Sequence, residues 1–228
     1  MPQLIAMVIV VVGAMIYMFQ TFGGTGDKIE GIAQKTSVIT EINNIKNGLK
    51  LAARNANIAA TENTTKEEYN NLQGLAKMKY FAEQMNTQLE KTTTGTNRTA
   101  LPNVYSAISF GGDSANAGGY TGDMLIQLVA AQGKIPGIFV DLSKGGLKDG
   151  AGFLESQIAN DLTGVAIIVR GDTAIADGTV TASSTARTVG TAEEIARIPA
   201  ETSSPALNDG MFTIYFKDFG ANEVVIDK

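Results

Sequence analysis

The first 26 residues of the chain contain no Asp, Glu, Lys or Arg, and this absence constrains the fold more than any other feature of the sequence. The run from Leu4 to Phe22, LIAMVIVVVGAMIYMFQTF, would span about 28 Å as a helix at about 1.5 Å per residue. That length is close to the roughly 30 Å thickness of the hydrocarbon core of a bilayer. We therefore expect an apolar helix over residues 1–26 that is held in a membrane or in the interior of a polymer.

The flanks of this run do not resemble those of a cleaved secretory signal. No basic residue precedes Leu4, and the sequence that follows the run, GGTGDK, is not the small-residue cleavage site that such a signal requires. Two interpretations remain open. The run is either an uncleaved membrane anchor or the start of a mature chain from which a basic leader has been removed.

A glycine-rich hinge and a long amphipathic helix are expected next. Gly23, Gly24 and Gly26 predict the hinge, because each glycine weakens a helix by up to about 1 kcal/mol relative to alanine. Apolar residues then recur at spacings of three, four and seven, which predicts a helix from about Lys28 to Ala60. The residues expected on its inward face are Ile32, Ile39, Ile42, Ile45, Leu49 and Ala52.

A second helix is predicted to reach about Lys91, before the composition changes. Thr65 and Glu68 fit a capping box at its start. Its apolar face is formed by Tyr69, Leu72, Leu75 or Ala76, Tyr80 and Leu89. The segment from Thr92 to Thr99, TTTGTNRT, has no periodicity and reads as a linker.

Beyond the linker, β-branched and aromatic runs indicate a small sheet. Strands are expected over Val104–Phe110, Gly164–Arg170, Met211–Phe216 and Glu223–Ile226, and helices over Gly122–Gln132 and Gly150–Asp161. The chain is thus expected to be α+β, with a long N-terminal helix and a β-rich globular head. Its expected parts are residues 1–26 (apolar helix and hinge), 27–95 (amphipathic helix and second helix) and 96–228, which we call the head.

The composition argues against an enzyme. The absence of His and Cys removes imidazole and thiolate metal sites, disulfides, and catalysis by Ser-His-Asp or Cys-His groups. A Walker loop is excluded because Gly133-Lys134 is followed by Ile135. We expect no catalytic residues, no metal and no cofactor. With a net charge of −5 and no basic cluster, the chain is not expected to bind nucleic acid through a basic patch.

Two segments match the acceptor pattern for N-glycosylation. They are Asn63-Thr64-Thr65 and Asn97-Arg98-Thr99, both in predicted turns. Asn63 and Asn97 are therefore candidate glycosylation sites if the protein is exported in an organism that glycosylates asparagine.

An apolar N-terminal helix followed directly by an amphipathic helix and then by a β-rich head resembles the ladle plan of type IV pilins. The resemblance covers about the first 55 residues. Ile5 stands where bacterial pilins commonly carry an acid, and archaeal pilins commonly lack that acid, so the chain resembles an archaeal-type or divergent bacterial pilin. The cysteine pair that often closes the pilin C-terminal region is absent. In that family a basic leader is removed, so the resemblance implies that Met1 would be the terminus exposed by that cleavage.

The resemblance implies a filament that assembles from the membrane. It implies a helical homopolymer at the cell surface, inserted in the membrane before assembly, handled by a pilus assembly machinery and serving adhesion, motility or surface attachment. Burial of some fifteen apolar side chains, at about 1.5 to 3 kcal/mol each, would hold such a polymer together. The expected core residues are Met1, Leu4, Ile5, Val8, Val11, Val12, Met15, Ile16 and Phe19. The alternative is a single-span, membrane-anchored surface or secretion-system component that does not polymerise.

Overall fold

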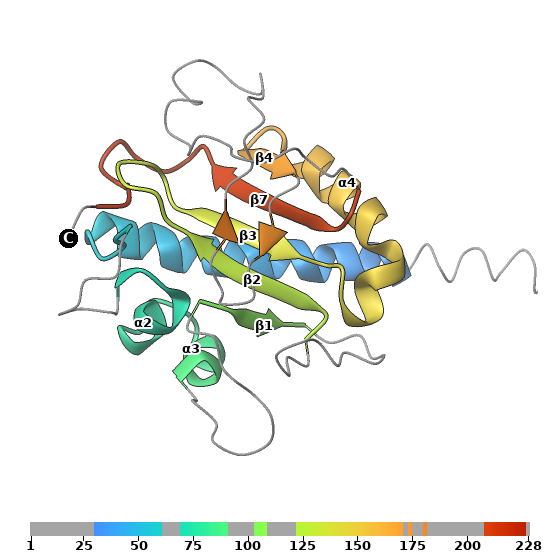
Figure 1. Ribbon diagram of the computed structural model, residues 1–228, viewed down its shortest axis with the longest axis horizontal. Helices are drawn as coiled ribbons and strands as arrows, with labels where there is room; N and C mark the ends of the chain where they lie inside the picture. Colours follow the sequence, from blue (N-terminus) through green and yellow to red (C-terminus); the bar gives the residue numbers. More distant parts are fainter. Residues whose placement is uncertain are drawn as a thin grey trace, which may run out of the picture.

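The computed structural model describes residues 30–60, 69–90, 103–108, 122–170, 173–174, 180–181 and 208–226. These residues form helices and antiparallel strands around a common apolar core, which confirms the predicted α+β class. Figure 1 shows the arrangement as layers, with a long helix behind a sheet and shorter helices at the two edges of that sheet.

The main sheet has five antiparallel strands in the order β1-β2-β3-β7-β4. These strands are β1 (Tyr105–Ala107), β2 (Met124–Val129), β3 (Gly137–Asp141), β4 (Ala166–Arg170) and β7 (Met211–Phe216). Two short strands, β5 (Thr173–Ala174) and β6 (Val180–Thr181), pair with each other in front of the sheet, on the side away from the long helix (Figure 1).

The helices cover one face of the sheet and both of its edges. The long helix, over residues 30–54, crosses behind β2, β3 and β7 (Figure 1). At the β1 edge lie α2 (Leu72–Lys77) and α3 (Glu83–Glu90). At the β4 edge, the 3-10 helix η2 (Gly145–Gly150) leads directly into α4 (Ala151–Leu162).

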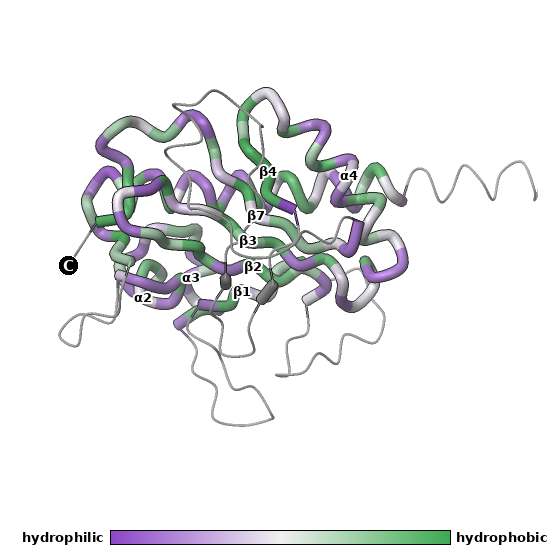
Figure 2. Tube along the Cα trace, turned by 45° about the horizontal axis from the view of Figure 1, so that its top comes forward, coloured by the Kyte–Doolittle hydropathy of each residue, from purple (hydrophilic) through white to green (hydrophobic). Residues whose placement is uncertain are grey.

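The core lies between the long helix and the sheet. Phe216 faces the helix, because the ammonium of Lys46 lies 4.6 Å from the centre of its ring. Side chains alternate along a strand, so Ile214 and Phe212 face the helix too. Their partners in the neighbouring strand β3, Ile138 and Val140, face the helix as well. On β3 and β7 this face is apolar, and Figure 2 shows hydrophobic residues concentrated along the central strands.

Most of the strand predictions hold. Met211–Phe216 coincides with β7, Gly164–Arg170 contains β4, and Val104–Phe110 contains β1, although its last two residues lie outside the described part. The predicted helix over Gly150–Asp161 is confirmed as α4.

Two predictions in this region are wrong. Residues 122–132 were expected to be helical, but they contain β2. Residues 124–129 are buried on both sides of the sheet, so their apolar run carries no strand alternation that would distinguish them from a buried helix. The expected strand over Glu223–Ile226 is absent, because only Ile226 makes a bridge, with Ala59.

The predicted helix from Lys28 to Ala60 ends six residues early. Ala56 adopts a left-handed conformation with φ 54°, its N–H donates to the carbonyl of Ala53, and the N–H of Asn57 donates to that of Ala52. This is a Schellman motif, which closes the helix at Arg54. The inward face is confirmed at Ile42, with Ile45, Leu49 and Ala52 also fully buried. Ile32 was wrongly assigned to it, because its side chain is 63% exposed.

The predicted second helix is two helices. Lys79, with φ 64°, and Tyr80 form another Schellman motif on the carbonyls of Ala76 and Leu75. This motif ends α2 and turns the chain before α3. The capping box at Thr65 lies outside the described residues, whereas α2 is capped by the side chain of Asn71, which accepts from the N–H of Gly74 at 2.8 Å.

Candidate functional site

The long helix over residues 30–54 is the candidate site, because its inward and outward sides differ sharply in charge. Between residues 31 and 53 the helix carries four charged residues, Lys35, Glu41, Lys46 and Lys50, and none of them belongs to its exposed residues. Each of the four has a partner in the head. The helix is thus attached to its own head along most of its length.

Lys46 and Lys50 hold the segment that follows β7. Both ammonium groups form ion pairs with the carboxylate of Asp218, at 2.8 and 3.2 Å. Lys50 also donates to the backbone carbonyl of Asp218 at 2.6 Å. The same two lysines lie over aromatic rings, Lys46 over Phe216 and Lys50 over Phe219 at 5.9 Å. A cation over a ring gains further stabilisation from the negative face of the π system.

Lys35 and Glu41 hold two other parts of the head. Lys35 pairs with Asp161 in the last turn of α4 at 2.8 Å. Glu41 interacts with the hydroxyl of Tyr105 on β1. Burial raises the pKa of Tyr105 well above its usual value, and the neighbouring carboxylate of Glu41 raises it further, so this tyrosine stays a neutral hydrogen-bond donor.

The C-terminal segment, residues 217–226, continues this attachment beyond the end of the helix. Arg54 donates from Nε and Nη2 to the buried carboxylate of Glu223, at 3.0 and 2.8 Å. The other oxygen of Glu223 accepts from the N–H of Gly220 at 2.7 Å. Ile226 then pairs with the chain beside Ala59, directly after the helix. The chain contains no cysteine, so ion pairs and backbone hydrogen bonds attach this segment where a disulfide is impossible.

Acid should weaken the attachment of the C-terminal segment. Burial raises the pKa of Asp218 and of Glu223, but hydrogen bonds and the cations of the long helix outweigh burial and leave both pKa values below normal. A carboxyl with a lowered folded pKa stabilises the fold above its unfolded pKa, and this contribution is lost as the pH falls through the folded pKa. The unfolded values are about 3.9 and 4.3. We therefore expect the free energy of unfolding to fall progressively below about pH 4.

The double variant Asp218→Asn/Glu223→Gln tests this prediction. Denaturant unfolding at several pH values should show a loss of about 1 kcal/mol at pH 7, as expected for partly exposed ion pairs. The difference from the parent chain should shrink as the pH falls, because the parent loses the same charges. A difference that stays constant from pH 7 to pH 2 would contradict the assignment.

Between its two end residues, Glu30 and Arg54, the helix has an uncharged outward side. Eight residues between positions 31 and 53 are exposed, and they are aliphatic residues, threonines and asparagines: Ile32, Ala33, Thr36, Thr40, Asn43, Asn44, Asn47 and Leu51. A helix that faces only water normally carries Lys, Glu or Arg on its outer side. We call these eight residues the outward face. Like residues 1–26, this face carries no charge. The charged residues that lie between the two are Asp27, Lys28 and Glu30.

The helix also approaches the chain near α2 very closely. A Cβ atom on Gly48 would lie 2.4 Å from the ring of Phe81 and 2.7 Å from the carbonyl oxygen of Tyr80. Only glycine allows this approach, which packs this side of the helix against Tyr80 and Phe81.

The residues predicted from the sequence to carry the function lie outside the described part. This holds for the nine expected core residues from Met1 to Phe19, for the hinge glycines 23, 24 and 26, and for Asn63 and Asn97. No helix among the described residues is long and apolar enough to cross a bilayer. The outward face could not be found from the sequence, because the partners of the lysines beside it lie in remote parts of the chain.

Comparisons with known proteins assign no relative to this chain. No protein-family model matches the sequence, and searches of curated proteins and of solved structures find no significant match. Within the described part of the chain, no group of three or more Asp, Glu, His or Cys residues is arranged to hold a metal ion. The roles proposed for the residues therefore rest on their positions and contacts.

Proposed function

We propose that this protein is the structural subunit of an extracellular filament similar to a type IV pilus. It polymerises through its apolar N-terminal segment and is not an enzyme. The observation that carries the proposal is the uncharged outward face, which extends the uncharged N-terminal segment into the part of the chain that bears the head. Both stretches are suited to packing against other protein rather than against water.

The charge distribution on the helix lowers the cost of assembly. Removing a charge from water is expensive unless it is paired, and removing one partner of a buried pair is more expensive still. Here Lys46 and Lys50 already pair with Asp218 in the same chain. Neither ammonium group would therefore lose its partner when a neighbouring subunit covers the helix. Protein interfaces are depleted of charge at their centre in the same way.

The composition of the outward face suits helix–helix contact. Small residues such as Ala33 allow close approach of two backbones, and threonine and asparagine side chains can hydrogen-bond across a helix pair. The larger association energy would come from the run Leu4 to Phe22, whose apolar side chains contribute about 1.5 to 3 kcal/mol each when buried. The outward face would then set how neighbouring subunits fit together.

The direct test is to look for the polymer. Cells are sheared, the extracellular fraction is imaged by electron microscopy, and the N-terminus of this chain is determined by mass spectrometry. Filaments that contain the chain, with a processed terminus at Met1, are the expected result. Recovery only from detergent-solubilised membranes, without a polymer, would overturn the proposal and favour the single-span anchor.

Charges placed on the outward face should block assembly. We expect the double variant Thr40→Glu/Asn47→Glu to reduce filament yield at least about tenfold, because two carboxylates would have to be buried unpaired at the subunit interface. The matched control is Gln84→Glu/Thr87→Glu, two exposed positions on α3. The control should assemble normally, and both variants should unfold within about 0.5 kcal/mol of the parent, as is usual for surface substitutions. Normal assembly of the first variant would show that the outward face is not an interface.

A further inference from the structure

We propose that one end of the folded part of the chain rests on the lipid surface before assembly and contacts the headgroup region through Phe153 of the head and Ile32 of the long helix. The inference depends on the proposed membrane insertion of residues 4–22. It adds a lipid-contacting surface on the folded head, which the apolar segment alone does not imply.

The two side chains are the most exposed large hydrophobic residues in the described part of the chain. Phe153 is 64% exposed and Ile32 is 63% exposed, in a fold whose other large apolar side chains are mostly below 9%. Phe153 lies in the first turn of α4 and Ile32 lies at the start of the described helix. Exposed aromatic and aliphatic side chains of this kind suit the boundary between lipid headgroups and acyl chains.

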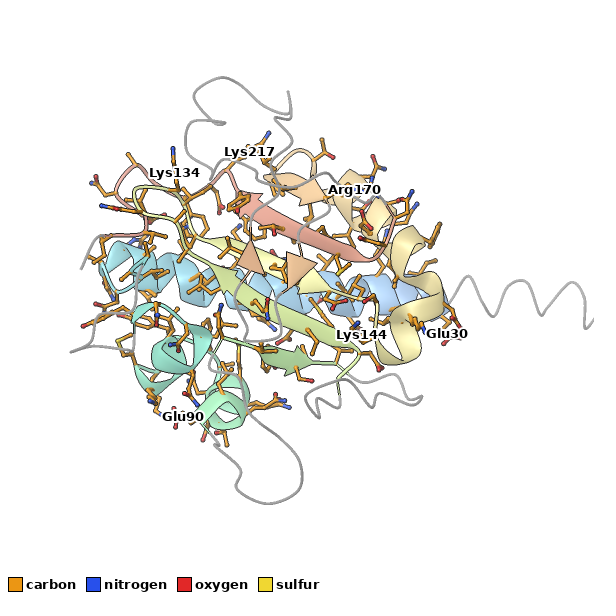
Figure 3. The ribbon with its side chains drawn as sticks, viewed as in Figure 1. Glu30, Glu90, Lys134, Lys144, Arg170 and Lys217 are labelled. Carbon is orange, nitrogen blue, oxygen red and sulfur yellow. The ribbon has the colours of Figure 1, made fainter. Side chains whose placement is uncertain are left out.

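Both residues belong to the same end of the molecule. Figure 1 shows α4 beginning beside the end of the long helix where the described chain starts, and Figure 3 places Glu30 and Lys144 at that end as well. Leu51, the exposed hydrophobic residue 19 positions further along the helix, lies about 28 Å away from Ile32 at about 1.5 Å per residue. An apolar contact at the Glu30 end is therefore well separated from the other end of the helix.

The short connection to the apolar run brings this end within reach of the membrane. Eight residue steps separate Phe22 from Glu30, and a chain of that length spans at most about 28 Å even when fully extended. Insertion of residues 4–22 therefore keeps the Glu30 end of the long helix within that distance of the headgroups. No comparable constraint acts on the end near Leu51.

The charges at this end make the contact independent of lipid charge. Lys144 and Lys148 form no ion pair with another described residue and can reach phosphate groups with their flexible side chains. Glu30 lies at the same end, and Asp149 directly follows Lys148 in the chain, so the two carboxylates offset the two ammonium groups. The apolar pair therefore carries the contact, and a neutral bilayer should support it.

The absence of tryptophan from the chain gives a direct measurement. Full-length Phe153→Trp and Ile32→Trp variants are each reconstituted into phosphatidylcholine vesicles, with and without lipid brominated near the headgroup end of the acyl chains. Val165→Trp is the control, an exposed position outside the outward face. We expect blue-shifted emission and about twofold quenching for the first two variants, and unchanged emission for the control.

Each outcome decides between the two proposals. Variants that fail to float with the vesicles would overturn both membrane insertion and this inference. Variants that float but show no quenching at positions 153 and 32 would overturn only this inference. Blue-shifted emission without quenching would mean that another copy of the chain covers these residues, and quenching at all three positions would mean that the head lies flat. Each of these last two results would also overturn the inference that Phe153 and Ile32 contact the lipid surface.

Discussion

Replacement of Glu155 by alanine is expected to lower the free energy of unfolding by about 3–5 kcal/mol, the range for breaking a buried ion pair. Glu155 lies on α4 and is fully buried. One of its carboxylate oxygens accepts from Nε of Arg170 on β4, and the other accepts from the N–H of Gly210 at 2.9 Å. Without the carboxylate, the guanidinium of Arg170, only 18% exposed, would lose its charged partner, and the buried N–H of Gly210 would lose its acceptor.

The ion pair of Glu155 and Arg170 also joins the end of β4 to the residues just before β7, which are far apart in the sequence. Arg170 is the last residue of β4, and its Nη2 donates to the side chain of Asn208 at 2.7 Å, where the described chain resumes before β7. The loss of Glu155 should therefore loosen α4, β4 and the start of β7 together. Urea denaturation followed by circular dichroism measures the effect.

Two controls separate this effect from a general cost of removing charges. Lys79→Ala breaks the exposed pair with Glu90, in which the lysine side chain is 66% exposed, and should cost no more than about 1 kcal/mol. The double variant Glu155→Met/Arg170→Met removes both buried charges and should recover part of the loss. A cost below 1 kcal/mol for Glu155→Ala would show that the pair does not stabilise the fold.

Ile42→Ala should destabilise the protein by about 2–5 kcal/mol, because it leaves a cavity between the long helix and the sheet. The side chain of Ile42 is fully buried within the common core. Ile32→Ala is the matched control, because it makes the same change in the same helix at a site that is 63% exposed. It should shift the free energy of unfolding by no more than about 0.5 kcal/mol.

The comparison isolates burial from helix propensity, since both variants replace isoleucine by alanine inside one helix. Chemical denaturation of both variants under identical conditions gives the difference. Equal losses in the two variants would mean that the long helix does not pack against the sheet through this face.

The ends of the helices could not be predicted from the sequence. The usual signal for a Schellman motif is a glycine in the left-handed position, and here Ala56 and Lys79 occupy it. The apolar pattern continues past both residues, to Ile58 and to Phe81, because the chain stays in the core after each helix ends. Periodicity alone therefore extended one helix to Ala60 and fused two others.

Only some of the interior strands of the sheet could be predicted from the sequence. Met211–Phe216 is a run of aromatic and β-branched residues, and this composition identified it as a strand. Residues 124–129 and 137–141 are buried on both faces, so they carry no alternation between apolar and polar residues. Their identity as β2 and β3 is fixed by pairing with each other and with β7, which no local pattern records.

The sequence by itself determined the uncharged segment 1–26, the α+β class, the amphipathic nature of the long helix and the absence of histidine and cysteine chemistry. Only the tertiary structure decided which way the charges of that helix point. The partner of Lys50 is 168 residues away, and that of Arg54 is 169 residues away. A lysine beside an apolar face can extend into water or bind a distant carboxylate, and the pairing of remote segments decides between them. That pairing leaves the outward face uncharged.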